Sequence, residues 1–390
     1  MILLMVLTIL PLYVGICVTV RCRACRRVHD WYYDRRGASL NDITLEDAAV
    51  IQRWLAEQEF PTTLSIAVFF ALFKTYGIPS ISSLLVSNGH MTTLQSLARR
   101  MADTSQLLNN AIIAPPTSDR AIDAVTRIAH LHHPFRQKGQ ISDDDMLYTL
   151  SLFALKGMRW VRKYEWRELT DLERCAIAVF WRHIGHDFGI PYTLLECDED
   201  ADALQWLQSL DAWSQKYEAQ HMRYAKSNAV LAQSTLRLLV GTKSARMQRL
   251  LGTVAAYLMG SRLCDAMGVP SPSPRSSAAI SYIVQIRKIF LRFFALPRLF
   301  AFRKHYIALK PSSTHSDRYY ALRSRAAPWY IRPTWTDRLK AWWKGLPQPG
   351  SPYRPEGYHL LSLGPDNTVH YRQADLYALK SEITARRQAF

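Results

Sequence analysis

One stretch in the middle of the chain predicts two successive helices. Residues 142–191 read SDDDMLYTLSLFALKGMRWVRKYEWRELTDLERCAIAVFWRHIGHDFGIP. Ser142 stands before three aspartates, and Thr170–Glu173 is a capping box, so both positions can bind the free N–H groups of a helix start. Gly189 and Pro191 are typical of a helix end. Because apolar residues in both runs follow helical spacing, the stretch indicates a helical domain.

The same pattern continues on both sides of this stretch. Beyond a helix start at Asn41–Asp47 and a buried helix at Thr63–Tyr76, helices are predicted at 90–113, 121–133, 201–220, 221–240 and 244–266. Breaks are expected at 114–120 and in a proline-rich loop at 269–275. An irregular tail is expected from about residue 346. Strand-like alternation is almost absent, and glycine is scarce, with 16 in 390 residues. The predicted fold class is all-α.

The chain opens with twenty residues that carry no charged side chain. As a helix, Met1–Val20 would extend ~30 Å, the thickness of a hydrocarbon core. The stretch lacks the basic start and small-residue cleavage site of a signal peptide. Arg21–Arg27 is basic, so the positive-inside rule places residues 21–390 in the cytosol. We therefore expect a single-pass anchor over 1–20 and a basic juxtamembrane linker over 21–40.

The net charge of +17 comes almost entirely from two segments. Residues 21–36 carry a net +4 and residues 286–345 a net +12. This distribution argues against a nucleic-acid-binding protein, and no RNA-binding module is recognisable. Aromatic residues alternate with the cations of the second segment. That mixture fits contact with anionic lipid headgroups, and it equally fits a solvated surface over a core.

Histidine and arginine residues around position 130 suggest a haem site. A haem iron needs an axial imidazole, cations for its propionates and an apolar pocket. His130 follows Arg127 by three positions, which places both on one helix face. About thirty residues upstream, Arg100 and Thr104 are one turn apart, with Asp103 beside them. These spacings alone are only suggestive.

Two other histidine motifs are weaker candidates for metal sites. His183 and His186 could hold a metal, but the aromatic residues around them favour a packing role. Glu218 and His221 form half of a dimetal-carboxylate motif, and a complete site needs a second such pair on another helix. No nucleophile elbow, dinucleotide motif or P-loop occurs.

Four stretches resemble a known family. They are FALFKTYGIPSISSLL at 70–85, ARRMADTSQLL at 98–108, and the longer ranges 127–153 and 159–191. Together they are similar to the rubber oxygenase (latex clearing protein) and mpaB-type oxygenase family, above all to its fungal, ER-bound branch. The resemblance covers roughly residues 45–260.

The resemblance implies an all-α, globin-like helical bundle that holds haem b and uses O2 to cleave isoprenoid double bonds. It implies that His130, in the motif Arg127-Ile-Ala-His130, is the proximal iron ligand. Arg100 and Thr104 match the distal R-x-x-x-T motif, and these two residues, with Asp103, would orient oxygen or a polar substrate group.

The chain also departs from the family pattern in three places. Asp103 stands where rubber oxygenases have a lysine, Leu84 where they have a distal glutamate, and Pro134 where an arginine follows the proximal histidine. The distal acid–base chemistry and the type of cleavage are therefore open.

The predicted protein is a membrane-anchored, haem-dependent oxygenase of fungal secondary metabolite biosynthesis. Its substrates would be O2 and an apolar or prenylated small molecule, with no nucleic acid partner. We expect an ER location, a cytosolic helical catalytic (haem) domain over 41–285 and a basic aromatic C-terminal extension over 286–390. The alternatives are a non-haem dimetal oxidase and a non-catalytic, membrane-tethered lipid-binding helical protein.

Overall fold

Two helices begin at the caps that the sequence predicted, Ser142 and Thr170, and two more begin after side-chain caps within or next to the predicted start at 41–47 and break at 114–120. In each case the cap side chain accepts a hydrogen bond from the backbone N–H three positions later, which satisfies a free donor of the first turn. The helices and their caps are α2 (Leu45–Trp54) with Thr44, α6 (Asp119–Gln137) with Ser118, α7 (Asp143–Tyr164) with Ser142 and α8 (Asp171–Asp187) with Thr170.

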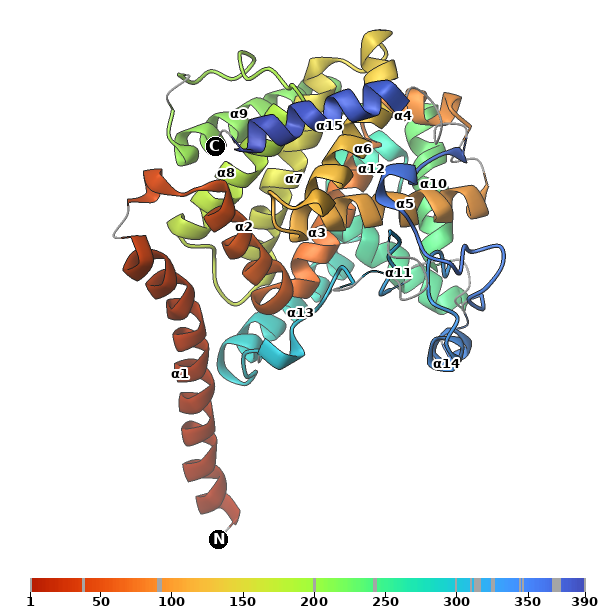
Figure 1. Cartoon of the computed structure of the whole chain (residues 1–390). Helices are drawn as coiled ribbons and strands as arrows, with labels where there is room; N and C mark the ends of the chain where they lie inside the picture. Colours follow the sequence, from red (N-terminus) through yellow and green to blue (C-terminus); the bar gives the residue numbers. More distant parts are fainter. Residues whose placement is uncertain are drawn as a thin grey trace.

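The computed structural model describes residues 2–36, 39–89, 93–198, 201–240, 244–298, 300–308, 311, 317–323, 327–343, 345, 347–366 and 373–388. Over these residues the chain contains helices and no strand, apart from one bridge between Tyr319 and Tyr358 (Figure 1). The all-α prediction is confirmed. The remaining α-helices are α1 (Ile2–Arg36), α3 (Pro61–Thr75), α4 (Pro79–Ser87), α5 (Leu94–Ile113), α9 (Ala203–His221), α10 (Lys226–Val240), α11 (Ala245–Met259), α12 (Ser261–Met267), α13 (Pro274–Phe293), α14 (Trp335–Trp343) and α15 (Gln373–Gln388).

The core is built from pairs of packed helices. α3 packs along α7, α2 along α8 and α5 along α6, while α15 covers α6 from outside (Figure 1). The main apolar cluster lies between α2, α6, α7, α8 and α9, and a second cluster joins α3 and α7 to α9 and α12. Between α2 and α3 the chain forms a π-helical turn, η2 (Leu55–Glu59). Short π-helical segments are frequent at functional sites.

The C-terminal part is more ordered than predicted. The tail expected to be irregular contains α15, and α13 begins inside the predicted loop at 269–275 and runs across residue 285. α15 is mostly polar, so its sequence shows no clear helical stripe. It is held by buried Leu376 and Ile383 and by an ion pair between Arg387 and Asp187. Trp329, Tyr330, Tyr358 and Leu360 also belong to the main core.

The predicted helix over 244–266 is two helices. Gly260 has a φ of +79°, a conformation that strains residues with a side chain, and it separates α11 from α12. The helix predicted from residue 221 begins only at Lys226. Lys310, Arg325 and Lys344 of the predicted basic segment lie outside the described residues.

Helix α1 extends away from the bundle and meets it through α13 (Figure 1). It is continuous through the position where the anchor was expected to end. The Tyr13 hydroxyl donates to the Phe294 carbonyl, and Arg21 donates to the Ala295 carbonyl at 2.6 Å. In the described part of the chain, no single helix combines the length and the apolar character needed to cross a membrane. The pair α3 and α4, bent by 86°, meets that test only together.

Candidate functional site

Two neighbouring helices, α5 and α6, carry all five residues predicted for the site. The connection between them is short, so they pack as antiparallel neighbours. Near this connection, Arg120 Nε donates to Asn110 Oδ1. Arg100, Asp103 and Thr104 lie on α5, whereas Arg127 and His130 lie on α6.

Asp103 is a buried carboxyl group, with 5% of its surface exposed. It accepts a hydrogen bond from the Tyr330 hydroxyl at 2.6 Å, and its other oxygen lies 3.9 Å from Arg99 Nε. Burial raises the pKa of Asp103 to about 6, although the Tyr330 hydrogen bond and the Arg99 charge oppose this change. Asp103 can therefore exchange a proton near neutral pH.

Arg127 faces this carboxyl group from α6. Its side chain is fully buried, and Nε donates to the Leu363 carbonyl at 2.7 Å. Burial lowers the pKa of Arg127 to about 10, while the charge of Asp103 raises it. The guanidinium therefore stays charged at neutral pH in surroundings that solvate it poorly.

His130 is buried one helical turn beyond Arg127, with 5% of its surface exposed. Arg100 and Thr104 are half-buried, one turn apart on α5. Burial lowers the pKa of His132, and the charge of Arg100 lowers it further. The structure thus brings Asp103 and Arg127 together, and it places Arg100 toward the histidine-bearing part of α6.

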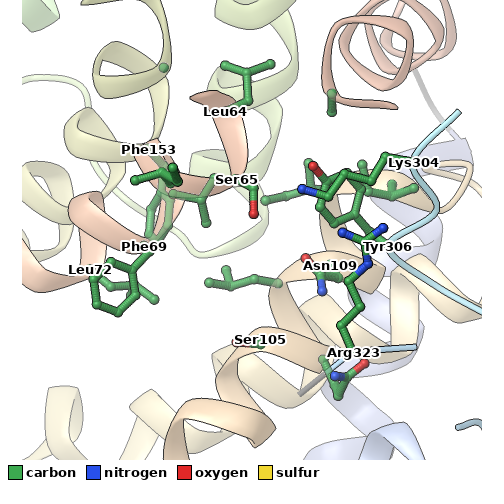
Figure 2. Close-up of a pocket in the computed structure, with 18 of the residues that line it drawn as sticks. Leu64, Ser65, Phe69, Leu72, Ser105, Asn109, Phe153, Lys304, Tyr306 and Arg323 are labelled. Atoms are coloured by element: carbon green, nitrogen blue, oxygen red, sulfur yellow. The ribbon is translucent and has the colours of Figure 1, made fainter. Parts of the chain in front are cut away.

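An apolar cavity with a volume of about 450 Å³ lies on another side of α5. Figure 2 shows Leu64, Phe69 and Leu72 of α3 and Phe153 of α7 along its wall. None of the five predicted residues lines this cavity. Its volume and mostly apolar wall are typical of a small-molecule site.

Helix α5 connects the cavity with the predicted residues. Met101 and Leu108 line the cavity and stand three positions before and four after Thr104. Residues at these spacings share one helix face, so the Thr104 side of α5 borders the cavity. Asp103, on a neighbouring face, bonds to Tyr330, and the adjacent residue Trp329 lines the cavity.

A second, more polar cavity of about 550 Å³ lies at the ends of α6 and α8. His132 and His133 line it together with the ion pair of Arg136 and Asp143, whose atoms are 2.7 Å apart. The His132 ring contacts the Ile128 carbonyl through Nδ1 at 2.7 Å. This contact accounts for the orientation of His132 without a metal, and His133 is exposed.

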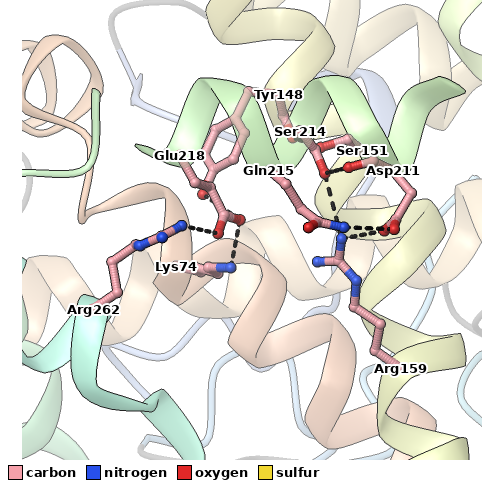
Figure 3. A network of polar contacts seen from close by, with 9 residues as sticks. All are labelled: Lys74, Tyr148, Ser151, Arg159, Asp211, Ser214, Gln215, Glu218 and Arg262. Atoms are coloured by element: carbon pink, nitrogen blue, oxygen red, sulfur yellow. Dashed lines mark hydrogen bonds and ion pairs between the residues drawn. The ribbon is translucent and has the colours of Figure 1, made fainter. Parts of the chain in front are cut away.

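The Glu218 motif is part of a charge network that joins α3, α9 and α12 (Figure 3). Glu218 forms an ion pair with Lys74, lies 4.0 Å from Arg262 and accepts a hydrogen bond from the Tyr148 hydroxyl at 3.3 Å. His221 instead stacks on the Tyr217 ring, 4.4 Å between centroids. Glu218 therefore acts as a counter-ion in this structure.

Over the described residues, one group has the geometry of a metal site: Cys25, His29 and Glu173. Arg167 donates a hydrogen bond to each carboxylate oxygen of Glu173 at 2.7 Å, and the Thr170 N–H donates to one of these oxygens at 2.8 Å. Burial raises the pKa of Cys25 to about 11, which disfavours the thiolate that binds metals. The group is better explained as a buried ion pair.

Sequence reasoning missed most of the cavity wall. Phe69, Leu72 and Phe153 have the ordinary pattern of core residues, and no local signal separates a cavity wall from a filled core. Lys304, Tyr306 and Arg323 come from the C-terminal extension and also line the cavity. The mixture of cations and aromatic residues in that segment was the only signal in the sequence.

Comparisons with known proteins agree with the resemblance. Residues 77–293 match the family described as "ER-bound oxygenase mpaB/B'/Rubber oxygenase, catalytic domain". The chain is 35% identical over 373 residues to ER-bound oxygenase mpaB' of Penicillium brevicompactum, covering 91% of this chain and 88% of that protein. It is 34% identical over 355 residues to ER-bound oxygenase mpaB of the same species, covering 87% and 84%. A third relative, mpaB of Penicillium roqueforti (strain FM164), is 38% identical over 206 residues, which is 52% of this chain and 69% of that protein.

Proposed function

The chain belongs to the family of ER-bound oxygenases and rubber oxygenases, and from that premise we propose that it is a membrane-anchored, haem-dependent enzyme. Family membership makes it an oxidoreductase. Its substrates would be O2 and an apolar or prenylated small molecule, in fungal secondary metabolism. The cavity of about 450 Å³ beside α5 carries this proposal, because it offers an apolar molecule a site lined by Met101 and Leu108 of the same helix as Thr104. The globin-like form of the bundle remains a prediction.

The donor groups on α6 fit haem b. His130 is a buried imidazole, the usual axial ligand of haem iron, and Arg127 is a buried cation suited to a propionate. Arg100 offers a second cation one helix away. When bound, haem b would supply the activation of O2, which protein side chains cannot provide.

The chain's own residues would position the reactants and manage protons. Asp103 can hold or release a proton at its carboxyl group near neutral pH, and Tyr330 fixes the orientation of that group. The Thr104 hydroxyl and the Arg100 guanidinium would bind a polar group of the substrate or of oxygen. The apolar wall formed by α3, α5 and α7 would exclude water and align the hydrocarbon part.

The visible spectrum of the purified full-length chain tests the proposal. We expect a Soret band with one haem per chain, and we expect His130→Ala to lose it. His133→Ala is the matched control, because His133 is exposed on the same helix and should retain haem. A colourless protein that contains two metal ions would support a dimetal oxidase. A protein without haem or metal after cofactor supplementation would support a lipid-binding role.

We also propose that residues 1–20 anchor the chain in the ER membrane as a single span, with the catalytic domain in the cytosol. Support comes from the uncharged sequence of this segment, from the basic flank that follows it and from relatives named as ER-bound. After carbonate extraction of microsomes, the full chain should stay in the membrane pellet. A chain lacking residues 2–20 should be released, and its retention would contradict a single anchor.

The exposed face of α13 supports a further membrane contact beside this anchor. α13 has no buried residue, and its exposed apolar residues fall on one stripe: Tyr282, Ile283, Ile286, Ile289, Phe290 and Phe293. Lys288 and Arg292 provide nearby positive charge, which suits anionic headgroups. Without residues 2–20, the chain should still bind vesicles that contain anionic lipid. Ile286→Ser with Phe290→Ser should weaken binding several-fold, whereas Tyr377→Ser on α15 should not.

A further inference from the structure

Helix α14 carries large apolar side chains on its exposed face. Trp335, Leu339, Trp342 and Trp343 expose 75%, 54%, 73% and 86% of their surface. Their spacing places them on one face of the helix, and we call this face the tryptophan stripe. Ala341, on the opposite side of the helix, is buried. A group of exposed apolar side chains of this size is typical of a surface that binds a partner.

Local contacts fix the start of α14 without using the tryptophan stripe. The Thr334 hydroxyl oxygen accepts a hydrogen bond from the Asp337 backbone N–H at 3.2 Å, and the Thr334 carbonyl accepts one from the Arg338 N–H at 3.0 Å. Lys340 donates to the Asp337 carboxylate at 3.2 Å. These contacts satisfy donors of the first turn. The stripe is therefore the preformed surface of a capped helix.

Helix α14 lies on the same side of the molecule as two other exposed apolar segments. In Figure 1 the N-terminal half of α1 extends below the bundle, and α13 and α14 both lie at the lower edge, whereas α15 lies near the upper edge. The Tyr13 hydroxyl donates to the Phe294 carbonyl at 2.9 Å, so the end of α13 is level with the proposed anchor. A bilayer that holds residues 1–20 therefore meets this edge of the domain.

The chemistry of the tryptophan stripe matches a membrane interface. A tryptophan side chain combines an apolar ring with one N–H donor, and such side chains are enriched where hydrocarbon meets the lipid headgroups. Arg338 and Lys340 are exposed and flank the stripe on its two sides. Cations beside an apolar stripe are typical of helices that lie in the plane of a bilayer, because they can reach the headgroup phosphates.

Helix α14 also follows closely on a segment that lines the apolar cavity. Trp329 lines the cavity and stands six positions before Trp335. Six residues extend over at most about 22 Å, so the stripe begins near this part of the wall. Leu322 lines the cavity too, and 45% of its surface is exposed. A membrane contact at α14 would hold an accessible part of the cavity wall near the bilayer, where an apolar substrate dissolves.

We propose that α14 lies in the interface of the bilayer that holds the anchor. Its tryptophan stripe enters the region between headgroups and acyl chains, and Arg338 lies at the phosphates. With α1 and α13, this helix gives the domain a third point of contact and fixes its tilt on the membrane. The proposal deepens the proposed function and rests on it for the identity of the bilayer. It assigns membrane binding to a helix outside residues 77–293, the part matched to the family's catalytic domain.

Photo-crosslinking from lipid to the full-length chain tests the proposal. The chain is reconstituted in vesicles of phosphatidylcholine and phosphatidylserine that contain a phospholipid with a diazirine near the glycerol end of one acyl chain. Labelled peptides are mapped by mass spectrometry. We expect α14 to carry several-fold more label than α15, which has the exposed aromatic residue Tyr377 and lies toward the other edge of the domain. Equal labelling of α14 and α15 would overturn the proposal.

Two pairs of substitutions locate the contact. Trp342→Ser with Trp343→Ser should reduce the label on α14 to the level of α15, and Trp335→Ser with Leu339→Ser should have the same effect. The matched control, Tyr377→Ser, should leave the label on α14 unchanged. All five side chains are exposed, so the core keeps its packing in each variant. Undiminished labelling of α14 in either pair would contradict the role of the stripe.

The label on α1 separates this proposal from the proposed anchor. Label on both α1 and α14 would support both contacts, and label on α1 alone would reject the contact of α14. Label on α14 without label on α1 would support the contact of α14 and reject the anchor. A second copy of the chain is the competing occupant of the stripe. Light scattering in detergent would then show a dimer that Trp342→Ser with Trp343→Ser converts to a monomer, and this result would contradict the proposal.

Discussion

At the scale of single residues, burial sets the behaviour of the charged groups in the candidate site. Asp103 and Arg127 lie on the packed helices α5 and α6, and both are removed from water. Removal from water raises the pKa of Asp103 and lowers that of Arg127. The Tyr330 hydrogen bond and the Arg99 charge offset part of the first change, and the Asp103 charge offsets part of the second. The result is a carboxyl group that titrates near pH 6 beside a permanent cation.

Asp103→Asn should change how stability depends on pH. The folded-state pKa lies above the ordinary value of 3.8, so ionised Asp103 destabilises the fold, and stability is lost as pH rises through about 6. Asparagine does not titrate and can still accept the Tyr330 hydrogen bond. The unfolding free energy of the variant relative to wild type should therefore increase by about 1 kcal/mol between pH 5 and pH 8.

Urea unfolding at the two pH values measures this difference. Asp366→Asn is the control, because hydrogen bonding to Arg99 holds the pKa of Asp366 near 2, well below the tested range. Its effect on stability should be the same at pH 5 and pH 8. If Asp103→Asn behaves like Asp366→Asn, the carboxyl group does not titrate between these values.

Lys156 on α7 should be a destabilising residue at neutral pH. Only 8% of its surface is exposed, and burial together with the charge of Lys74 lowers its pKa to about 7. The unfolded chain keeps the proton up to the ordinary value of 10.5, so stability rises with pH between 7 and that value. Lys156→Met should stabilise the fold by roughly 1–3 kcal/mol at pH 7.

Denaturant titrations at pH 7 and pH 9 measure the effect of Lys156→Met. The gain should be smaller at pH 9, because the wild-type folded state is then mostly neutral at this position. Lys163→Met is the control on the same helix, since Lys163 is exposed. A loss of stability in Lys156→Met would show that the attraction to Glu218 outweighs burial.

At the scale of secondary-structure elements, α15 is held by a contact that its own sequence does not reveal. Arg387 donates to Asp187 at 2.6 Å and also to the Pro116 carbonyl at 2.5 Å. It thereby joins α15 to the end of α8 and to the segment before α6. Both charged side chains are almost fully buried, at 4% and 5% exposure.

Arg387→Met should destabilise the fold by about 3–5 kcal/mol, because it leaves the Asp187 carboxylate buried without its partner. The double variant with Asp187→Asn should recover part of the loss. Arg386→Met, next in the chain and more exposed, should cost less than about 1 kcal/mol. The unfolding free energies of the three variants test this prediction. Equal losses of stability in Arg387→Met and Arg386→Met would contradict the role of the buried ion pair.

At the scale of the whole molecule, the two ends of the chain relate differently to the bundle. Residues from 327 onward contribute Tyr330, Tyr358, Leu363 and Ile383 to the core. By contrast, Ile9, Leu10 and Leu12 of α1 are exposed. The basic extension is therefore part of the folded domain, while the first turns of α1 are not needed to complete its core.

Truncations should show this difference. A chain that ends at residue 345 should lose cooperative thermal unfolding, because it removes Leu363, the carbonyl partner of buried Arg127. A chain lacking residues 2–12 should keep its Tm within about 2 °C of the full chain in the same detergent. A truncated chain ending at residue 345 that unfolds normally would show that the domain is complete without the C-terminal part.

The sequence by itself determined the helical class, most helix starts and the family. Capping joins residues three positions apart, as Thr170 and Glu173 show, so these features are local and readable in one dimension. The spacing of Arg127 and His130 along one helix is local in the same way. Only the tertiary structure decided the environment of Asp103, whose partner Tyr330 is 227 positions away. It also decided the cavity, because its wall combines α2, α3, α5, α7 and α8 with residues 304–306, 322, 323, 327 and 329. Packing between distant segments determines which apolar residues fill the core and which surround a space, and that information is absent from any single segment.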